Sequence, residues 1–322
     1  MSLVPPQVST LGEAMLRLSV KDGERLEDAA VYEVHVAGAE ANVAFALARV
    51  GVPARWASAL PRNALGHRIG ATLAAGGVDI SPVRWVEDSR LGTYFVEFGA
   101  APRGTQVIYD RQASAAACAT VEDFDWERIL DATAFHISGI TFATSNASAG
   151  VARHAVAEAH RRGLFVSFDV NYRLKLSSPQ EAADVVMQTA PMIDLLMCPA
   201  GDAALLFGLE GEMEEVAGGL HEQLGIDRVV VTNGATGSAA ASADGILSQP
   251  AHDVEVVDRI GAGDAFAAGV LWGVLCEDSL RSGLERGSAM AALKMTLRGD
   301  LFRLGSVEVD ALMAGHTFRI NR

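Results

Sequence analysis

Short apolar runs alternate with longer helical patterns along most of the chain, beginning near residue 40. The apolar runs are strand-like, whereas the segments between them repeat apolar residues at helical spacing and end in glycine. This alternation predicts an α/β domain with a mostly parallel sheet covered by helices. The predicted helices span 41–50, 64–75 and 148–162, and the predicted strands span 134–138, 164–170, 193–197 and 228–232.

Two segments depart from this rhythm. Residues 13–36 have the pattern of a strand pair around the polar stretch KDGERLED. Residues 92–112 alternate polar and apolar positions about a Gly/Pro turn, which is typical of a half-exposed hairpin. Because both are flanked by βα material, we expect them to form a small accessory sheet, a lid, over one edge of the main domain. No repeat or linker divides the chain, so a single domain spanning 1–322 is predicted.

The composition narrows the class of protein. Hydrophobic residues make up 50% of the 322 positions and charged residues 20%, which excludes general disorder. The formal net charge of −14 disfavours a nucleic-acid partner, because the overall field repels phosphates. No apolar run is as long as a membrane span, and MSLVPPQVST has no basic region followed by an apolar stretch, so neither a membrane nor a secretory role is predicted.

The cysteine and lysine positions argue against a disulfide-rich fold, a zinc site and a P-loop nucleotide site. Three widely spaced cysteines fit neither a disulfide framework nor a zinc site, so we expect a reducing cytoplasm. Lysine occurs only at positions 21, 175 and 294, so an anionic substrate must be held by local arginines. The absence of a Gly-Lys dipeptide excludes a P-loop, and Phe266 occupies the third glycine position of a dinucleotide fingerprint.

The stretch DRIGAGDAF, residues 258–266, places the carboxylate of Asp264 between a glycine-rich turn and an apolar run. If a helix begins near Asp264, the turn directs free backbone N–H groups at one point and the helix dipole adds positive potential there. The stretch then forms an anion hole with a carboxylate beside it. The alternative is that Asp264 only caps a buried helix. This nonapeptide alone does not distinguish the two.

Four polar clusters stand out against the apolar background: AGAEAN (37–42), YDR (109–111), DVNYR (169–173) and GAGD (261–264). Ligands of parallel α/β sheets collect at the carboxyl ends of the strands. DVNYR and GAGD each follow a strand candidate, so we expect the clusters to share one pocket.

Two of these clusters belong to longer motifs that resemble the signatures of the PfkB, or ribokinase-like, carbohydrate kinases. AGAEANVAFALARVG, followed by Gly66, resembles the N-terminal signature, and GAGDAFAAGVL the C-terminal one, about 220 residues later. The resemblance covers essentially the whole chain, including the lid segments and VVVTNGATG at 229–237. It implies a three-layer ribokinase-like fold with a β-sheet lid that closes over substrate and often forms a homo-oligomer contact.

Within the family the chain is most similar to 2-keto-3-deoxygluconate kinases. The matching stretches are LGEAMLRL, GAEAN, YDRQASA, DVNYRLKL, VDRIGAGD and the late RGD at 298–300. The resemblance implies Mg²⁺- and ATP-dependent phosphorylation of a sugar-acid hydroxyl, the terminal one of 2-keto-3-deoxygluconate. The alternatives are the same chemistry on a neutral sugar such as fructose or ribose, and a catalytically silent regulator that binds a sugar or nucleotide.

The resemblance implies that Asp264 is the catalytic base and that the amides of Gly261, Ala262 and Gly263 form the anion hole. Physical reasoning agrees, because a hydroxyl is a poor nucleophile until a carboxylate accepts its proton, and preorganised N–H groups stabilise the charge of phosphoryl transfer. The other implied site residues are Gly38, Ala39, Asn42 and Asp300 for the sugar, Tyr109 and Arg111 from the lid, Asn171 and Arg173 between sugar and phosphate, and Thr232, Gly234 and Gly237 on the nucleotide side.

Several of these residues have structural alternatives. Asn42 also suits the first turn of a helix, and an arginine on a hairpin is usually solvated. Tyr109 and Arg111 share a face of an alternating strand, so both can point from the lid into the pocket. TNGATG, taken alone, is only a turn.

The chain departs from the family at 199–206, PAGDAALL. Most members carry Asn-x-x-Glu near here, tied to magnesium and phosphate handling, whereas this chain offers only Asp202. Either Asp202 substitutes after a one-residue shift, or waters and nucleotide phosphates hold the metal. The metal ligands therefore stay unassigned.

Overall fold

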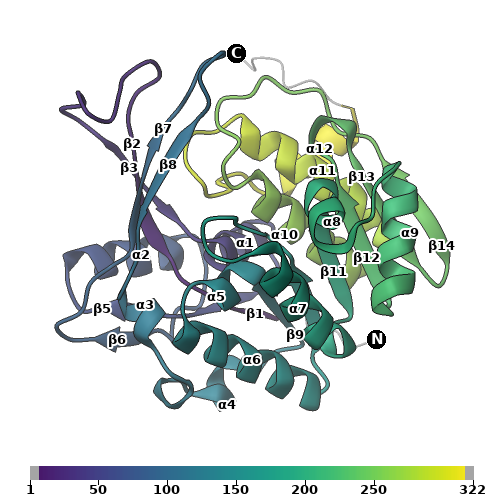
Figure 1. Cartoon of the computed structure of the whole chain (residues 1–322), viewed down its shortest axis with the longest axis horizontal. Coiled ribbons are helices and arrows are strands. Elements are labelled where there is room, and N and C mark those ends of the chain that lie inside the picture. The colour runs from purple at the N-terminus through teal and green to yellow at the C-terminus, as the bar shows by residue number, and fades with distance from the viewer. Residues whose placement is uncertain (1–6, 316–322) are drawn as a thin grey trace.

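The computed structural model describes residues 7–315 (Figure 1). The two ends of the predicted domain 1–322, and residues 1–6 of the stretch used for the targeting prediction, lie outside the described residues. No helix among residues 7–315 has both the length and the apolar character needed to cross a membrane.

An eight-stranded sheet forms the centre of the molecule, in the order β14-β13-β12-β11-β10-β9-β1-β4. The pairs from β12 to β4 are parallel, and β13 and β14 extend the sheet as antiparallel strands, so the predicted mostly parallel sheet is confirmed. The strands are β1 Val8–Leu11, β4 Ala54–Ala57, β9 Ala134–Ser138, β10 Phe165–Asp169, β11 Leu195–Pro199, β12 Arg228–Thr232, β13 Ser238–Ser242 and β14 Gly245–Gln249.

Helices cover both faces of this sheet, which makes the fold three-layered (Figure 1). Alternate residues of one strand enter different cores: Leu195 packs with α1, α10 and α11, whereas Leu196 packs with α6 and α9. The helices are α1 Ala39–Arg49, α2 Ala64–Ala75, α3 Ala115–Cys118, α4 Trp126–Ile129, α5 Gly139–Ala143, α6 Asn146–Arg161, α7 Pro179–Thr189, α8 Ala200–Phe207, α9 Met213–Leu224, α10 Ala262–Glu277, α11 Leu280–Met295 and α12 Ser306–Met313.

A separate four-stranded sheet, the lid sheet, projects from the main body (Figure 1). It contains β2 Met15–Ser19, β3 Glu33–Ala37, β7 Thr93–Glu97 and β8 Gln106–Asp110 in the order β3-β2-β7-β8. The two hairpins join because β2 pairs in parallel with β7. Tyr94 and Val96 form a small apolar cluster on this sheet, against which Ile260 packs. The predicted second sheet is thus confirmed. A two-stranded pair, β5 Ala59–Pro61 and β6 Arg84–Val86, was not predicted.

Element boundaries differ from the sequence predictions by at most two residues, with a physical cause. The strand predicted at 193–197 runs from Leu195 to Pro199, because Ile193 still closes the turn after α7 through its bond to the Ala190 carbonyl. The expectation that GAGD directly follows a strand was wrong. Residues 250–261 form neither helix nor strand, and the edge strand β14 is antiparallel, so packing of α10 against α1 and α11 brings Asp264 into position.

Candidate active site

The glycine-rich turn ends at the start of α10, where Asp264 is the third helical residue. Gly261 precedes the helix with a φ of +86°, and a Cβ there would clash with the Asp300 carbonyl oxygen, so this position requires glycine. The amide of Ala262 donates to the Arg259 carbonyl oxygen at 3.2 Å. Of the three expected anion-hole amides, those of Gly261 and Gly263 therefore stay available within the described residues.

Asp264 forms a hydrogen bond with Asn42 from α1. Asn42 Nδ2 donates to Asp264 Oδ2 at 2.7 Å, while Asn42 Oδ1 is buried without a partner among the described residues. Burial raises the pKa of Asp264 to about 6, and the bond from Asn42 and the nearby Arg173 guanidinium limit that rise. The carboxylate is therefore poised to change protonation state near neutral pH.

The beginning of α1 is fixed by packing as well as by hydrogen bonds. Gly38 precedes the helix, and a Cβ at Gly38 would clash with the main chain at Glu13, two residues before β2; Ala39 is the first helical residue. Glu40 is fully buried and its Oε1 accepts bonds from the Ser138 amide at 3.0 Å and from the Ser138 and Thr141 hydroxyls at 2.7 Å. Burial raises the pKa of Glu40. Glu40, missed by the sequence analysis although it lies within AGAEAN, ties α1 to the end of β9.

Asp169 lies near Asp264, and Asp202 lies near Asp169. Asp169 ends β10 and Asp202 lies in the first turn of α8. Burial raises the pKa of Asp169 to about 7, and the charges of Asp264 and Asp202 add to that rise. Asn171, which has a positive φ of 43°, donates from Nδ2 to Asp169 Oδ2 at 3.2 Å. The exposed Arg173 guanidinium opposes the rise in the pKa of all three carboxyls, so it is a counter-charge that this group shares.

The two predicted lid residues differ in their surroundings: Arg111 is buried in an ion pair, whereas Tyr109 is partly exposed. Arg111 follows β8, is buried, and pairs with Glu13 through Nη2–Oε2 at 2.5 Å and Nε–Oε2 at 2.7 Å. Its Nη2 also donates to Thr144 Oγ1 at 2.8 Å. Tyr109 is 36% exposed and its ring lies 5.5 Å from that of Tyr94, centroid to centroid. Arg111 therefore already has a carboxylate partner within the protein.

Asp300 belongs to a buried ionic network, formed by Arg17, Tyr94, Asp258, Lys294 and Asp300. Tyr94 donates its hydroxyl to Asp300 Oδ1 at 2.6 Å, and Arg17 contacts Asp300 Oδ2 and Asp258 Oδ2 at 2.6 Å each. Burial raises the pKa of Asp300 to about 6, opposed by Arg17. Four of the five residues were missed, although Arg17 and Asp258 lie in the quoted stretches LGEAMLRL and VDRIGAGD. The network joins the lid sheet to the segment before Asp264.

The predicted nucleotide-side residues lie at the carboxyl end of β12. Thr232 ends the strand, Gly234 begins a single 3₁₀ turn and Gly237 ends it. Because β10, β11 and β12 are parallel, this end lies on the same sheet edge as Asp169.

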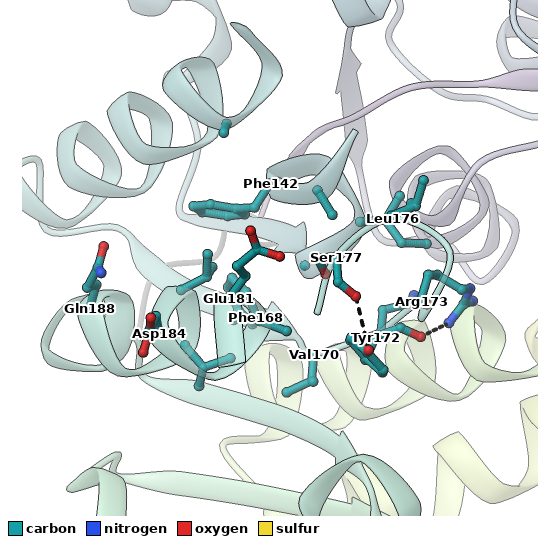
Figure 2. A pocket seen from close by; sticks show the side chains of 18 of the residues that line it. Phe142, Phe168, Val170, Tyr172, Arg173, Leu176, Ser177, Glu181, Asp184 and Gln188 are labelled. Atoms are coloured by element: carbon teal, nitrogen blue, oxygen red, sulfur yellow. Dashed lines mark hydrogen bonds between the residues drawn. The ribbon is translucent and has the colours of Figure 1, made fainter. Parts of the chain in front are cut away.

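A pocket of about 600 Å³ lies between α5, α6, α7 and the loop after β10. Figure 2 shows side chains that line it. Arg173 lies at one end and Gln188 at the other. Tyr172 donates its hydroxyl to the Ser177 carbonyl oxygen at 3.0 Å, which folds the loop over the pocket. Asn171 and Arg173 line this pocket, whereas Asp264 and Asn42 do not.

Residues 6–303 match the pfkB family of carbohydrate kinases. The chain belongs to this family. The PfkB kinase is 38% identical to the 2-dehydro-3-deoxygalactonokinase of Haloferax volcanii over 98% of this chain and 99% of the relative. Among solved structures it is similar to the 2-dehydro-3-deoxygluconokinase of Thermotoga maritima, with a TM-score of 0.90 and 33% identity over 97% and 99% of the two chains.

A third relative bears on the cofactor of the PfkB kinase. A candidate ribokinase II of E. coli, solved in complex with ATP and Mg²⁺, has a TM-score of 0.86 and 25% identity, covering 97% of this chain and 100% of its own. Together these relatives identify the PfkB kinase as an ATP-dependent sugar kinase whose homologues include kinases of 2-keto-3-deoxy sugar acids.

Proposed function

We propose that this PfkB kinase transfers the γ-phosphoryl group of ATP to the terminal hydroxyl of 2-keto-3-deoxygluconate, giving the 6-phosphate. The observation that carries the proposal is the Asn42–Asp264 hydrogen bond at the start of α10. The similarity to kinases named for 2-dehydro-3-deoxy sugar acids supports the substrate class.

Asp264 acts as the general base in this proposal. Asn42 engages Oδ2, which leaves Oδ1 to accept the proton of the attacking hydroxyl, and a pKa of about 6 leaves the carboxylate mostly ionised at neutral pH. The unpartnered Oδ1 of Asn42 can accept a hydrogen bond from a second sugar hydroxyl. The two side chains together orient the sugar for attack.

The amides of Gly261 and Gly263, at the positive end of the α10 dipole, form the anion hole. They stabilise the charge that spreads over the phosphoryl oxygens during transfer. Thr232, Gly234 and Gly237 line the nucleotide side, and Asn171 and Arg173 lie between sugar and phosphate. The Arg173 guanidinium donates to only one acceptor among the described residues, the Tyr172 carbonyl oxygen at 2.9 Å, so it can turn to an anion.

The residues near Asp264 fit a Mg²⁺ ion bound with the phosphates. Asp169 and Asp202 are half-buried carboxyls whose pKa values are raised by desolvation, which a cation would relieve. Mg²⁺ usually takes one or two carboxylates plus phosphates and waters. Within residues 7–315 no group of three or more side chains suits a metal by itself, which agrees with a site completed by the nucleotide. When bound, Mg²⁺ neutralises charge on the phosphates.

The choice between sugar acid and neutral sugar rests on the arginines. Arg173 offers a free guanidinium to a carboxylate, and Tyr109 presents a hydroxyl from the lid sheet. The pairing of Arg111 with Glu13 specifically favours the second candidate, a kinase of neutral sugars, because a neutralised Arg111 attracts a substrate carboxylate weakly.

A coupled ADP-release assay over a matched set of substrates tests the proposal. The set contains 2-keto-3-deoxygluconate, its galacto epimer, fructose and ribose. We expect kcat/KM for the two acids to exceed that for the neutral sugars by at least about tenfold, since a charge-assisted hydrogen bond contributes roughly 1.5–3 kcal/mol. A higher value for fructose or ribose would replace the sugar acid with a neutral sugar. No turnover of any sugar would favour the silent regulator.

The three cysteines, free in the described chain, and the use of ATP support the cytoplasm as the proposed compartment. The lid sheet supports a proposed homo-oligomer contact, because its edge strand β8 exposes 54% of Ile108. Light scattering of wild type and Ile108→Glu checks this, with a fall in mass expected for the variant. An unchanged mass would argue against the contact.

A further inference from the structure

Lys294 is one of only three lysines in the chain, and its side chain is completely buried, 0% exposed. It lies in the last turn of α11, where a lysine usually neutralises the carbonyl end of its own helix. Here Nζ instead donates to the main-chain carbonyl oxygen of Asp258 at 2.8 Å. The ammonium therefore acts on the segment that leads into Asp264.

That segment is held on both sides of Asp258. The amides of Val257 and Asp258 donate to the Met295 carbonyl oxygen at 2.8 and 3.1 Å. The Asp258 carboxylate accepts bonds from the Ile260 amide at 3.0 Å and from the Gly299 amide at 3.1 Å. Since Ile260 immediately precedes Gly261, a displacement of the Asp258 main chain would move the Gly261 amide.

The ammonium of Lys294 is one of two cations that offset the carboxylates around it. Lys294 and Arg17 supply two positive charges against the carboxylates of Asp258 and Asp300. Asp264, close enough for Lys294 to lower its pKa, adds a third negative charge. Without Lys294, Arg17 would be the one cation of the network against these three carboxylates. Their negative charge would then repel a polyphosphate that binds beside them.

We propose that Lys294 is a positioning residue for phosphoryl transfer. Its ammonium holds the segment from Asp258 to Gly261 in the conformation that presents the anion-hole amides, and it provides a fixed positive charge behind them. This inference rests on the proposed function. The completely buried position suits the compact ammonium, whereas the planar guanidinium of arginine requires more space and more acceptors.

The experiment compares Lys294→Met and Lys294→Ala with wild type and with Lys21→Met, a control at an exposed lysine. We expect Lys294→Met to lower kcat by about 10²-fold, the usual loss for a disturbed anion hole. The Kd of ADP should stay within about twofold, whereas the complex of ADP, Mg²⁺ and aluminium fluoride, which mimics the transferring phosphoryl group, should bind at least about tenfold more weakly. Ammonium ions should restore activity to Lys294→Ala, saturably, but not to Lys294→Met, whose side chain fills the space.

The acidic limb of the pH–kcat/KM profile gives an independent readout. Asp264 faces Asn42 and Glu40 from α1, Arg173 and Asp169 from β10 and its loop, and Lys294 from α11. Loss of the Lys294 charge should move this limb to higher pH in Lys294→Met, which a purely structural role would not do.

The role of Lys294 and the proposed function can fail independently of each other. The ratio of kcat between Lys294→Met and wild type is measured with whichever sugar wild type phosphorylates. If wild type phosphorylates no sugar, the proposed function fails, but binding of the aluminium fluoride complex still tests the role of Lys294. A folded Lys294→Met with kcat and mimic affinity within twofold of wild type overturns the inference. Equal losses of ADP and mimic affinity, with no ammonium rescue, also overturn it. If Lys294→Met does not fold, Lys294→Gln, which keeps an N–H donor for Asp258 but no charge, takes its place.

Discussion

Asn42 and Asp264, 222 positions apart in the sequence, are joined by a 2.7 Å hydrogen bond from the Nδ2 of one to the Oδ2 of the other. Through this bond the first turn of α1 meets the first turn of α10; the sequence predicted a shared pocket for the two motifs but not this contact. The bond selects one oxygen of Asp264 and leaves the second free. The bond therefore orients Asp264 and lowers its proton affinity.

Substitution Asp264→Asn should lower kcat by about 10²-fold or more, because the amide keeps the shape and the capping ability of aspartate but cannot accept a proton. ATP binding should be unchanged within about twofold. Steady-state kinetics and calorimetry of ATP measure both. Asp244→Asn, at an exposed turn, is the matched control. Near-normal turnover of a folded Asp264→Asn protein would reject Asp264 as the base.

Substitution Asn42→Leu should make activity more sensitive to acid. The amide of Asn42 stabilises the ionised Asp264 and lowers its pKa, so its loss raises the pKa above the present value of about 6. Because the ionised form is the base, the acidic limb of kcat/KM should move to higher pH by about one pH unit, the effect of a charge-assisted hydrogen bond. Activity at pH 6 should fall more than activity at pH 8. A parallel loss at both pH values would show that Asn42 acts only on sugar binding.

Substitution Asp169→Asn should stabilise the ligand-free protein at pH 8, and by only about half as much at pH 5.5. The pKa of Asp169 is about 7 in the folded protein and near 3.9 in an unfolded chain, so folding takes up a proton between these values. The ionised carboxylate of Asp169 therefore destabilises the folded state, and this penalty is largest above pH 7. We expect a gain of about 1–2 kcal/mol in unfolding free energy at pH 8, measured by urea denaturation. A gain of equal size at pH 5.5 would contradict the assigned titration.

Substitution Asp202→Asn should raise the Mg²⁺ concentration for half-maximal rate by about tenfold, because one carboxylate ligand of a phosphate-bound metal is lost. The asparagine oxygen can still accept the bond from the Tyr172 amide, 3.2 Å away in wild type, so the loop after β10 should persist. Titration of Mg²⁺ at saturating ATP and sugar gives the result, with Glu210→Gln as an exposed control just beyond α8. Equal Mg²⁺ dependence in Asp202→Asn and wild type would leave the metal to waters and phosphates.

Substitution Arg111→Leu should lower the unfolding free energy by about 3–5 kcal/mol, because it leaves the Glu13 carboxylate buried without its cation. The double variant Arg111→Leu with Glu13→Gln should recover part of this loss, since no uncompensated charge is then buried. Denaturation midpoints of the four proteins form a double-mutant cycle. Independent, additive losses would mean that the pair contributes nothing as a pair.

The sequence by itself determined the fold class, the family and, to within two residues, the bounds of the three helices and four strands that it predicted. The strands 134–138 and 228–232 were predicted with both ends correct, because they are central strands whose apolar run is as long as the buried part of the sheet. The lid sheet followed from local alternation in two separate segments. Such features depend on neighbours within a few residues, which a pattern records directly.

The tertiary structure alone decided which side chains meet. The sequence marked Arg111 and Asp300 as polar residues of a site, but it could not show that Glu13 pairs with one and Arg17 with the other, or that Lys294 is buried against Asp258. The strength of a charge in a site depends on desolvation and on the nearest opposite charge. Both are set by segments that are distant in sequence and are brought together only when the sheets and helices pack.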